Sequence, residues 1–494
     1  MRGSGILMPI FSLSSPYGIG TFGKKAFEFI DFLKRGGQSY WQILPLCPID
    51  YSGSPYQSVS CFAGNPLFID LDLLVADGLL TQSDISEFSY NNAYADYNSL
   101  KNSREVLFSR AFKKFDTESA DFKDFKNNSS WLRVYSAFCA IKDSFDGLPF
   151  TFWDEKFRRF SEEALVLAES EFKERTEYYN FIQYEFFKQW SSLKAYANKN
   201  GIKIIGDIPI YVALDSADVW SDPSQFDLNS DLKPNFVAGV SPDAFSATGQ
   251  RWGNPLYNWK KAAGEKEPFS WWKKRLSHAF KLYDTVRIDH FRAFESYYAI
   301  PSSSESALEG SWRKGPGIKF FDEMKKTFGA ELPLIAEDLG LIGEDVVRLL
   351  KESGLPGMKV MQFGIDDGPK STHLPHNYVK NSVAYLGTHD NDTIIGWQSK
   401  ASEEKKKFAY DYIGFGKSEG FNISMIRALF ASVSDIAVIT LADLMGLDSS
   451  GRINTPGTDK NNWQWRIQDG CVNDWLADIL FDLTATYARE NTKK

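Results

Sequence analysis

The chain of 494 residues is 43% hydrophobic and 24% charged, which is typical of a globular protein with a large core. Its formal net charge of −8 argues against a nucleic-acid partner, which would require a basic face. The four Cys are scattered and no apolar run reaches the roughly 18 residues of a membrane span, so we expect a cytoplasmic protein that binds no membrane.

Strand-like and helical patterns alternate along the chain. Eight short apolar runs, many of them β-branched, have the two-sided hydrophobicity of buried parallel strands. Helical patterns at 24–35, 177–197, 322–328 and 343–354 fall between them. This alternation predicts an α/β fold of the (β/α)8 TIM-barrel class. The predicted strands are 38–46, 65–71, 203–212, 285–291, 333–340, 358–365, 382–390 and 436–445.

Two gaps between predicted strands are too long for a simple crossover helix. We expect residues 72–200 to form a mainly helical inserted subdomain. Residues 213–284 are rich in Pro, Gly, Asp and Trp, and we expect an inserted subdomain with a substrate-covering loop. The whole chain, 1–494, is then one catalytic barrel with both insertions at the C-terminal face of its strands. About 50 residues follow the last predicted strand, too few for a C-terminal β-sandwich domain.

Three short motifs match known sites but lack the flanking structure that those sites need. YGIGTFG (17–23) contains G-x-G-x-x-G, but a turn-like segment precedes it, so we expect a glycine-rich loop and no dinucleotide site. GKSEG (416–420) lacks the apolar strand that leads into a nucleophile elbow. His373 and His376 form HxxH without further ligands at suitable spacing. We therefore expect no metal and no other cofactor.

Carboxylates follow several of the predicted strands. Asp207, Asp289, Glu337, Asp390 and Asp443 each lie near the end of a separate apolar run. Any one of them alone could be a structural ion-pair partner. Because a barrel brings the ends of its strands together at one mouth, several of these groups are expected to converge. Closely placed carboxylates push each other's pKa values apart, and burial raises the pKa of the one that stays protonated.

Such a pair suits glycoside chemistry, which needs one ionised and one protonated carboxyl group. The ionised group attacks or stabilises an oxocarbenium-like centre, and the protonated group donates to the leaving oxygen. Arg287 lies two residues before Asp289 and hence on the same face of a strand. Its positive charge is expected to keep Asp289 ionised.

Several longer motifs carry a family resemblance. RIDHF (287–291), AEDLG (336–340) and GTHDNDT (387–393) resemble three hallmark regions of the α-amylase clan. SPYQ (54–57) and GQRWGNPLYNW (249–259) are more specific, and they resemble the 4-α-glucanotransferases, the amylomaltases or disproportionating enzymes of glycoside hydrolase family 77. Further similar segments extend the resemblance over nearly the whole chain: WQILPL (41–46), GNPLFID (64–70), GDIPIYV (206–212) and NTPGT (454–458).

The resemblance implies an enzyme that transfers α-1,4-glucan segments from a donor maltooligosaccharide to the 4-hydroxyl of an acceptor glucan or glucose. It implies a retaining double displacement with Asp289 as the nucleophile and Glu337 as the general acid and base. Asp390 would hold ring hydroxyls of the donor sugar. Asp243 and Trp252 would lie on a mobile loop that covers the site. The full set of implied substrate contacts is Tyr56, Asp207, Asp243, Trp252, Arg287, His389 and Asn454.

Three features depart from the family pattern or extend it. Ala293 stands where the family usually has Gly. QFGI (362–365) lacks the second aromatic residue expected after QF on the sixth strand, which puts a stacking contact on the acceptor side in question. Tyr51 and Tyr97 could form a second glucan site on the surface.

Two alternatives to the transferase stay open. One is a hydrolase of the α-amylase clan, and the other is a non-catalytic glucan-binding protein on the same scaffold. The covering loop and the short tail favour the transferase over the hydrolase. The presence of all three carboxylates disfavours the binding protein.

Overall fold

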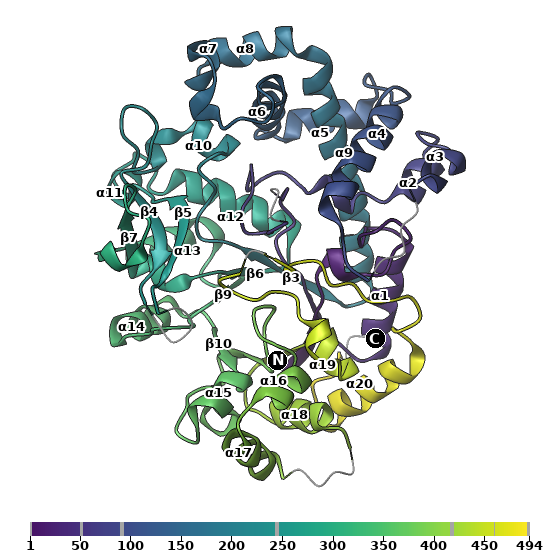
Figure 1. Ribbon diagram of the computed structural model, residues 1–494, viewed down its shortest axis with the longest axis vertical. Coiled ribbons are helices and arrows are strands. Elements are labelled where there is room, and N and C mark those ends of the chain that lie inside the picture. Colours follow the sequence, from purple (N-terminus) through teal and green to yellow (C-terminus); the bar gives the residue numbers. More distant parts are fainter. Residues whose placement is uncertain are drawn as a thin grey trace.

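The computed structural model describes residues 2–49, 53–88, 93–242, 247–414, 419–458 and 460–491. Within these ranges eight parallel strands close a barrel in the order β1-β12-β11-β10-β9-β6-β3-β2, with helices between them (Figure 1). This confirms the predicted (β/α)8 fold. The strands are β1 Gly3–Leu7, β2 Tyr40–Gln42, β3 Lys203–Ile208, β6 Thr285–Ile288, β9 Leu334–Ala336, β10 Gly357–Val360, β11 Ser382–Tyr385 and β12 Ile436–Thr440.

Seven of the eight predicted strands contain a barrel strand, but the prediction for 65–71 is wrong. That segment forms the short 3-10 helix η2 Pro66–Phe68 and leads into α2 Leu71–Ala76. Its polar residues are helix caps, since the Asn65 side chain accepts from the backbone N–H of Leu67 and Asp70 accepts from that of Leu73.

The strand that replaces it is β1, whose sequence GSGIL carries little hydrophobic signal. All five of its residues are nevertheless buried. Glycine is required at its centre, because a Cβ on Gly5 would lie 2.7 Å from Cβ of Tyr40 on the neighbouring strand β2. Because close packing of two barrel strands requires glycine here, hydrophobicity alone does not predict this strand.

The four predicted helical patterns all form helices, each in a connection between successive strands of the barrel. They are α1 Lys24–Arg35, α9 Lys173–Lys199, α13 Ile318–Phe328 and α14 Glu344–Ser353. Gly354 ends α14 in the left-handed conformation at φ 74°, as its position in the pattern predicts.

Residues between β2 and β3 form helices that lie at the top of Figure 1, joined to the barrel by the long helix α9. Besides α2 and α9 they are α3 Gln82–Ser86, α4 Tyr97–Phe112, α5 Ala120–Asn128, α6 Leu132–Ser144, α7 Glu155–Arg158 and α8 Glu162–Glu171.

Residues after β3 contribute to a second, antiparallel sheet beside the barrel mouth. Its described strands follow the order β5-β4-β7-β8: β4 Phe236–Val240, β5 Gln250–Pro255, β7 Ser296–Pro301 and β8 Ser311–Lys314. Strands β7 and β8 come after β6, so two separate connections build this sheet, and the sequence prediction did not include the second. The division into inserted subdomains at 72–200 and 213–284 stays our proposal. Helices α10 Ala217–Ser221, α11 Trp259–Ala263 and α12 Ser270–Leu282 complete this region.

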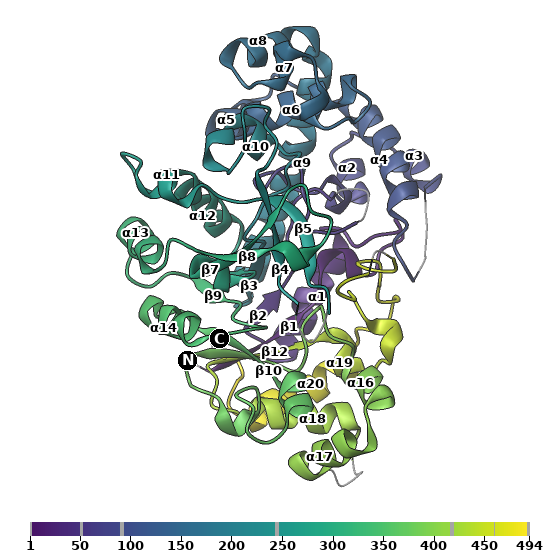
Figure 2. The same ribbon diagram turned by 60° about the vertical axis from the view of Figure 1, so that its left-hand side comes forward.

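The last third of the chain adds helices at the bottom of Figure 1 and Figure 2. They are α15 Met361–Asp367, α16 Ile394–Lys400, α17 Glu403–Ile413, α18 Phe421–Phe430, α19 Leu441–Met445 and α20 Asp474–Thr486. The remaining 3-10 helices are η1 Ile10–Ser12, η3 Phe150–Phe152, η4 Pro223–Gln225, η5 Phe291–Phe294, η6 Ala307–Glu309, η7 Pro375–Asn377 and η8 Ser449–Gly451.

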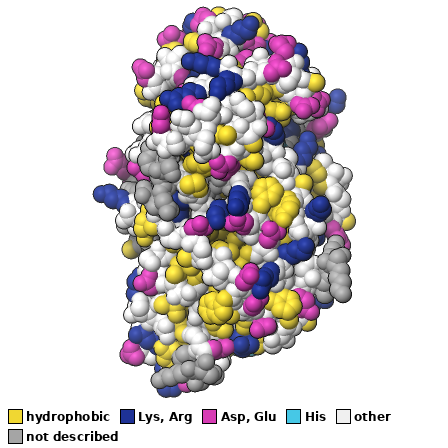
Figure 3. Space-filling view, turned by 90° about the vertical axis from the view of Figure 1, so that its right-hand side faces the viewer, with side chains coloured by type: hydrophobic (Ala, Val, Ile, Leu, Met, Phe, Trp, Pro, Cys, Tyr) yellow, Lys and Arg dark blue, Asp and Glu magenta, His cyan; other side chains and the backbone are white. Residues whose placement is uncertain are grey.

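None of the helices in the described ranges combines the length and hydrophobicity needed to cross a membrane. The side of the molecule drawn in Figure 3 carries acidic, basic and apolar side chains interspersed rather than gathered by type. Among the described side chains of that face there is no continuous basic surface.

A single arginine closes the N-terminal end of the barrel. Arg489 is 0% exposed. Its guanidinium donates to the backbone carbonyls of Phe430, Gly3, Ser434 and Ser432 at 2.8–3.1 Å. It thereby ties the end of the chain to β1 and to the turn that enters β12, where the first and last barrel strands meet.

Replacing Arg489 with Ala should lower the free energy of unfolding by about 3 kcal/mol or more, because the Gly3 and Ser434 carbonyls lose this donor, while Arg2 still donates to the carbonyls of Phe430 and Ser432. Urea unfolding followed by circular dichroism measures this. Arg110→Ala is the matched control, since Arg110 is 41% exposed and pairs with Asp84 and Glu87 at the surface. Equal midpoints for the two variants would contradict a role for Arg489 in barrel closure.

Candidate active site

Charged residues from separate strands meet at the C-terminal mouth of the barrel. Asp207 and Arg287 lie on the neighbouring strands β3 and β6 as a registered pair. Asp289 follows β6, and Glu337 follows β9, which pairs with β6. Because all these strands run parallel, their ends lie at the same edge. The structure thus brings together four of the predicted residues on three adjacent strands.

Arg287 is buried between two carboxylates. Its Nη1 contacts the Asp207 oxygens at 2.9 and 2.7 Å, and its Nη2 lies 3.0 Å from Oδ1 of Asp289. The Arg287 side chain is 4% exposed and the Asp207 side chain is 0% exposed, whereas Asp289 keeps 31% exposure. One guanidinium therefore neutralises a buried carboxylate and holds a second one that faces the mouth.

Tyr56 and His389 extend this network toward the loops. The Tyr56 hydroxyl donates to Oδ2 of Asp207 at 2.8 Å and lies 2.9 Å from Nε2 of His389. The two rings stack with centroids 5.5 Å apart. Burial lowers the pKa of His389, so its imidazole is neutral at pH 7. Trp463 packs against both rings at 5.6 and 5.8 Å.

Glu337 is fixed by backbone amides. The N–H of His290 donates to Oε2 at 2.6 Å, and the N–H of Leu339 donates to Oε1 at 2.8 Å. His290 adopts the left-handed conformation at φ 55°, which turns the chain sharply at the end of β6. The Glu337 side chain, after β9, is therefore bonded to the main chain that follows β6.

The two carboxyl groups differ in their readiness to ionise. Burial raises the pKa of Glu337 to about 8, with Arg287 opposing the rise and Asp289 adding to it. Burial also raises the pKa of Asp289, to about 6, against the attraction of Arg287. Asp289 has the closer cation and the greater exposure, so it ionises first. At pH 7 Asp289 is therefore the ionised member of this pair and Glu337 the protonated one.

Asp390 lies at the edge of the same network. Its Oδ2 is 3.5 Å from Nε2 of His389, and its Oδ1 accepts from Nδ2 of Asn454 at 2.6 Å. The backbone N–H of Asn454 donates to the His389 carbonyl at 3.1 Å. Asn454, which lies on the segment before Trp463, thus connects this segment to the residues at the barrel mouth.

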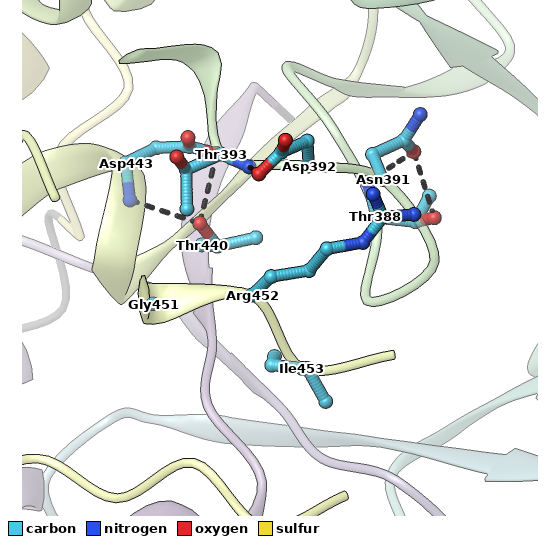
Figure 4. Close-up of a pocket in the computed structure, with 9 residues that line it drawn as sticks. All are labelled: Thr388, Asn391, Asp392, Thr393, Thr440, Asp443, Gly451, Arg452 and Ile453. Atoms are coloured by element: carbon cyan, nitrogen blue, oxygen red, sulfur yellow. Dashed lines mark hydrogen bonds between the residues drawn. The ribbon is translucent and has the colours of Figure 1, made fainter. Parts of the chain in front are cut away.

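A small polar pocket lies beside this segment. Figure 4 shows that its walls come from the turn after β11, from the start of α19 and from the end of η8. Asp443 is buried there and links α16 to α19, since it accepts from the N–H of Ile394 at the start of α16 and from the hydroxyl of Thr440, the N-cap of α19. This explains Asp443 as a structural carboxylate. The lining residues are Thr388, Asn391, Asp392, Thr393, Thr440, Asp443, Gly451, Arg452 and Ile453.

Trp252 lies on strand β5 and contacts the turn that follows β6. Its ring packs edge-on against His290 at 4.9 Å, and its Nε1 donates to the Gln250 side chain at 3.1 Å. Asp243 lies outside the described residues. Arg292, in contrast, lies away from these groups: its guanidinium stacks on Trp312 at 3.8 Å and donates to the carbonyl of Leu341.

Other sequence motifs have structural explanations. The glycine-rich loop before α1 is closed by the chain itself, because Thr21 donates to Asp70 at 2.6 Å and a Cβ on Gly23 would collide with that carboxylate. The ring nitrogen Nδ1 of His373 accepts from the N–H of Val360 at 3.1 Å. Residues 416–418 of the GKSEG motif lie outside the described residues. In the described part of the chain, no group of three or more His, Cys, Asp and Glu is arranged to hold a metal ion.

Three further expectations have mixed outcomes. Tyr97 is buried and its hydroxyl donates to the carbonyl of Trp463, so the prediction of an exposed site at Tyr97 is wrong. Tyr51 lies outside the described residues. Gly364 and Ile365 belong to helix α15 and not to the sixth strand. Ala293 is buried within η5.

Sequence reasoning missed Trp463 and Arg452 as parts of the site. Trp463 lies five residues after the NTPGT segment, and its backbone adopts the left-handed conformation at φ 63°, which the sequence did not predict. Arg452 contacts only backbone carbonyls in this network, and such contacts leave no motif.

Comparisons with known proteins agree with this geometry. A family model described as 4-alpha-glucanotransferase matches residues 8–472. The chain is 44% identical to a 4-alpha-glucanotransferase of Clostridium butyricum over 98% of this chain and 100% of the relative. It is 44% identical to one of Streptococcus pneumoniae over 99% and 98%. The amylomaltase of Streptococcus agalactiae in complex with acarbose is 40% identical and superposes with a TM-score of 0.96, covering 99% and 100%.

The raised pKa of Glu337 predicts a pH-dependent effect of its removal on stability. The folded protein holds this proton from the ordinary glutamate pKa of about 4.3 up to about 8, so the cost of the buried charge grows over that range. Glu337→Gln should therefore gain in thermal midpoint relative to the unsubstituted protein as pH rises from 5 to 9. The matched control is Glu331→Gln, at an exposed position. A constant difference for Glu337→Gln would contradict a raised pKa.

Proposed function

Since the chain belongs to the 4-alpha-glucanotransferase family, glycoside hydrolase family 77, we propose that Asp289 and Glu337 carry its reaction. The protein transfers α-1,4-glucan segments from a donor maltooligosaccharide to the 4-hydroxyl of an acceptor glucan or glucose. The observation that carries the proposed residue roles is the unequal protonation of two carboxyl groups on adjacent barrel strands.

The first half-reaction forms a covalent intermediate on Asp289. The Asp289 carboxylate attacks C1 of the donor sugar, and the bond from C1 to the glycosidic oxygen breaks. Glu337 gives its proton to that oxygen, so the leaving saccharide departs as an alcohol. The product is a β-linked glucosyl ester of Asp289, and Glu337 is left ionised.

The second half-reaction returns both groups to their starting state. The Glu337 carboxylate takes the proton of the acceptor 4-hydroxyl, whose oxygen attacks C1. The ester bond to Asp289 breaks and its carboxylate is restored. Two inversions at C1 give net retention, so the new bond is again α-1,4.

The surrounding groups fit binding of the donor sugar. Asp390 offers carboxylate oxygens at the mouth, and Asn454 fixes one of them. Tyr56 and His389 offer a hydroxyl and a neutral imidazole, both aligned through Asp207 and Arg287. Hydrogen bonds of this kind lower the barrier when they strengthen in the transition state.

Transfer in place of hydrolysis requires that water be kept from the intermediate. Trp252 supports a cover over the mouth, because strand β5 brings it onto His290 beside the nucleophile. We extend this role to Asp243 on the connection between β4 and β5. The four Cys carry free thiols, which favours a reducing compartment, and we propose a cytoplasmic location.

Incubation with maltotriose tests the reaction. The expected products are glucose, maltose and saccharides longer than maltotriose. Asp289→Asn should lower kcat by about 1,000-fold or more, since it removes the nucleophile. Asp322→Asn, at an exposed position on α13, is the matched control and should keep full activity. Maltose and glucose alone would support a hydrolase, and unchanged maltotriose would support a glucan-binding protein.

The covalent intermediate can be trapped in Glu337→Gln with α-maltosyl fluoride. Fluoride leaves without a proton from Glu337, whereas release of the enzyme from the ester needs its carboxylate as a base. Mass spectrometry should find a maltosyl adduct on the peptide that contains Asp289. An adduct on another residue, or fluoride release without any adduct, would contradict the assignment.

The pH profile of kcat/KM should be bell-shaped. The acid limb near pH 6 reports protonation of Asp289, and the alkaline limb near pH 8 reports loss of the Glu337 proton. In Glu337→Gln with α-maltosyl fluoride, the rate of first fluoride release should keep the acid limb and lose the alkaline one. An alkaline limb that persists there would mean that another group supplies the proton.

A further inference from the structure

The geometry points to Arg452 as a positioning residue for Asp390 and Asn454, the side chains that hold the donor sugar under the proposed function. The inference rests on that function, because it concerns the same subsite. Arg452 itself donates to protein carbonyls and not to the substrate side of the mouth.

Arg452 holds two segments that lie far apart in sequence. Its Nε donates to the carbonyl of Asn454 at 2.7 Å, and its Nη2 donates to the carbonyl of Asp390 at 2.8 Å. The side chains of these two residues are bonded to each other at 2.6 Å. One guanidinium thus fixes the backbones whose side chains form the outer edge of the donor site.

The backbone of Arg452 is anchored through Ser449 of η8 to Asp392 on the turn after β11. Its backbone N–H donates to the carbonyl of Ser449, and the Ser449 hydroxyl donates to Asp392 at 2.9 Å. Lys400 bonds both Asp392 and Ser449, at 2.5 and 2.8 Å. Arg452 therefore reaches the sugar-binding residues from a fixed point on η8.

The turn that carries Asp390 is also braced by hydrogen bonds within itself. Oδ1 of Asn391 accepts from the N–H and the hydroxyl of Thr388 at 2.9 and 3.0 Å. Figure 4 shows the Arg452 side chain extending across the polar pocket toward this turn. Asp390 therefore lies on a turn that is held both by the Asn391 brace and by the Arg452 guanidinium.

Arginine suits this position because its nitrogens lie in one rigid plane, so a single side chain meets two carbonyls in fixed directions. Lysine offers one nitrogen on a flexible stem and cannot reproduce that geometry. A displacement of about 1 Å at a sugar contact can cost about 100-fold in rate, because the transition state demands tighter placement than the bound substrate. Loss of Arg452 should consequently lower kcat more than it raises KM.

Arg452→Ala tests the inference in maltotriose disproportionation. We expect kcat to fall by about 10- to 100-fold, with KM changed less than about threefold. Guanidinium ion added to Arg452→Ala should restore part of kcat, while Arg452→Lys should remain impaired. The matched control is Arg427→Ala, which removes a guanidinium that bonds Glu419 with two nitrogens on α18, outside the site network.

A double-mutant cycle separates positioning from general destabilisation. If Arg452 acts through Asn454, then Arg452→Ala combined with Asn454→Ala should cost clearly less in kcat than the product of the two single losses. Thermal midpoints are measured for every variant. Three results together would overturn the inference. The loss of kcat in each variant would parallel its loss of thermal midpoint, and the losses caused by Arg452→Ala and Asn454→Ala would multiply in the double variant. Guanidinium ion would not restore the activity of Arg452→Ala.

The outcomes also separate this inference from the proposed function. If Arg452→Ala keeps kcat within twofold while Asp390→Asn and Asn454→Ala lose activity, only the role of Arg452 is wrong. If the unsubstituted protein forms nothing longer than maltotriose, the proposed function is wrong. If Arg452→Ala does not fold, Arg452→Lys carries the test, and full activity there overturns the inference.

Discussion

The buried contact of Arg287 with Asp207 and Asp289 is the interaction on which the site depends. It links the neighbouring strands β3 and β6 by their side chains at the point where their backbone pairing ends. Without the guanidinium, Asp207 would be an unpaired buried charge, which would strongly destabilise the folded protein. Because Asp207 also accepts from Tyr56, and Tyr56 meets His389, the same ion pair organises two loops beyond the strands. The positions of Tyr56 and His389, which we propose as contacts of the donor sugar, therefore depend on the buried ion pair between Asp207 and Arg287.

The two carboxyl groups that we propose to react differ more in their burial than in the kind of partner they have. Asp289 keeps 31% exposure beside the Arg287 guanidinium, whereas Glu337 is 8% exposed and accepts from two backbone N–H groups. Both kinds of partner favour the ionised form, so the higher pKa of Glu337 comes from its burial, which outweighs them. The barrel thus holds both groups rigidly and leaves only one of them charged. Pre-set protonation of this kind is what a double displacement demands of its acid and its nucleophile.

The sequence predicted the half of the site that lies on strands better than the half that lies on loops. Carboxylates after apolar runs identified Asp207, Asp289, Glu337 and Asp390, because strand ends obey a simple geometric rule. Residue periodicity and hydrophobicity did not predict strand β1, because its glycines are needed for close packing against Tyr40. They also failed where polar residues were helix caps, as in 65–71. Arg452 acts through backbone carbonyls, and Trp463 has an unusual φ. Residue spacing predicts neither feature.

The two halves of the site are built differently, and this difference suits the reaction. Asp207, Arg287 and Glu337 are fixed by barrel strands, whose mutual pairing resists displacement. Asp390 and Asn454 lie on connections that hold one another by hydrogen bonds between loops. Charges that develop in the transition state need rigid partners, since reorganisation during the reaction would consume the stabilisation they provide. Asp390 and Asn454, which we propose as sugar contacts, have no strand pairing to hold them, and hydrogen bonds between their loops, including those of Arg452, keep them in place instead.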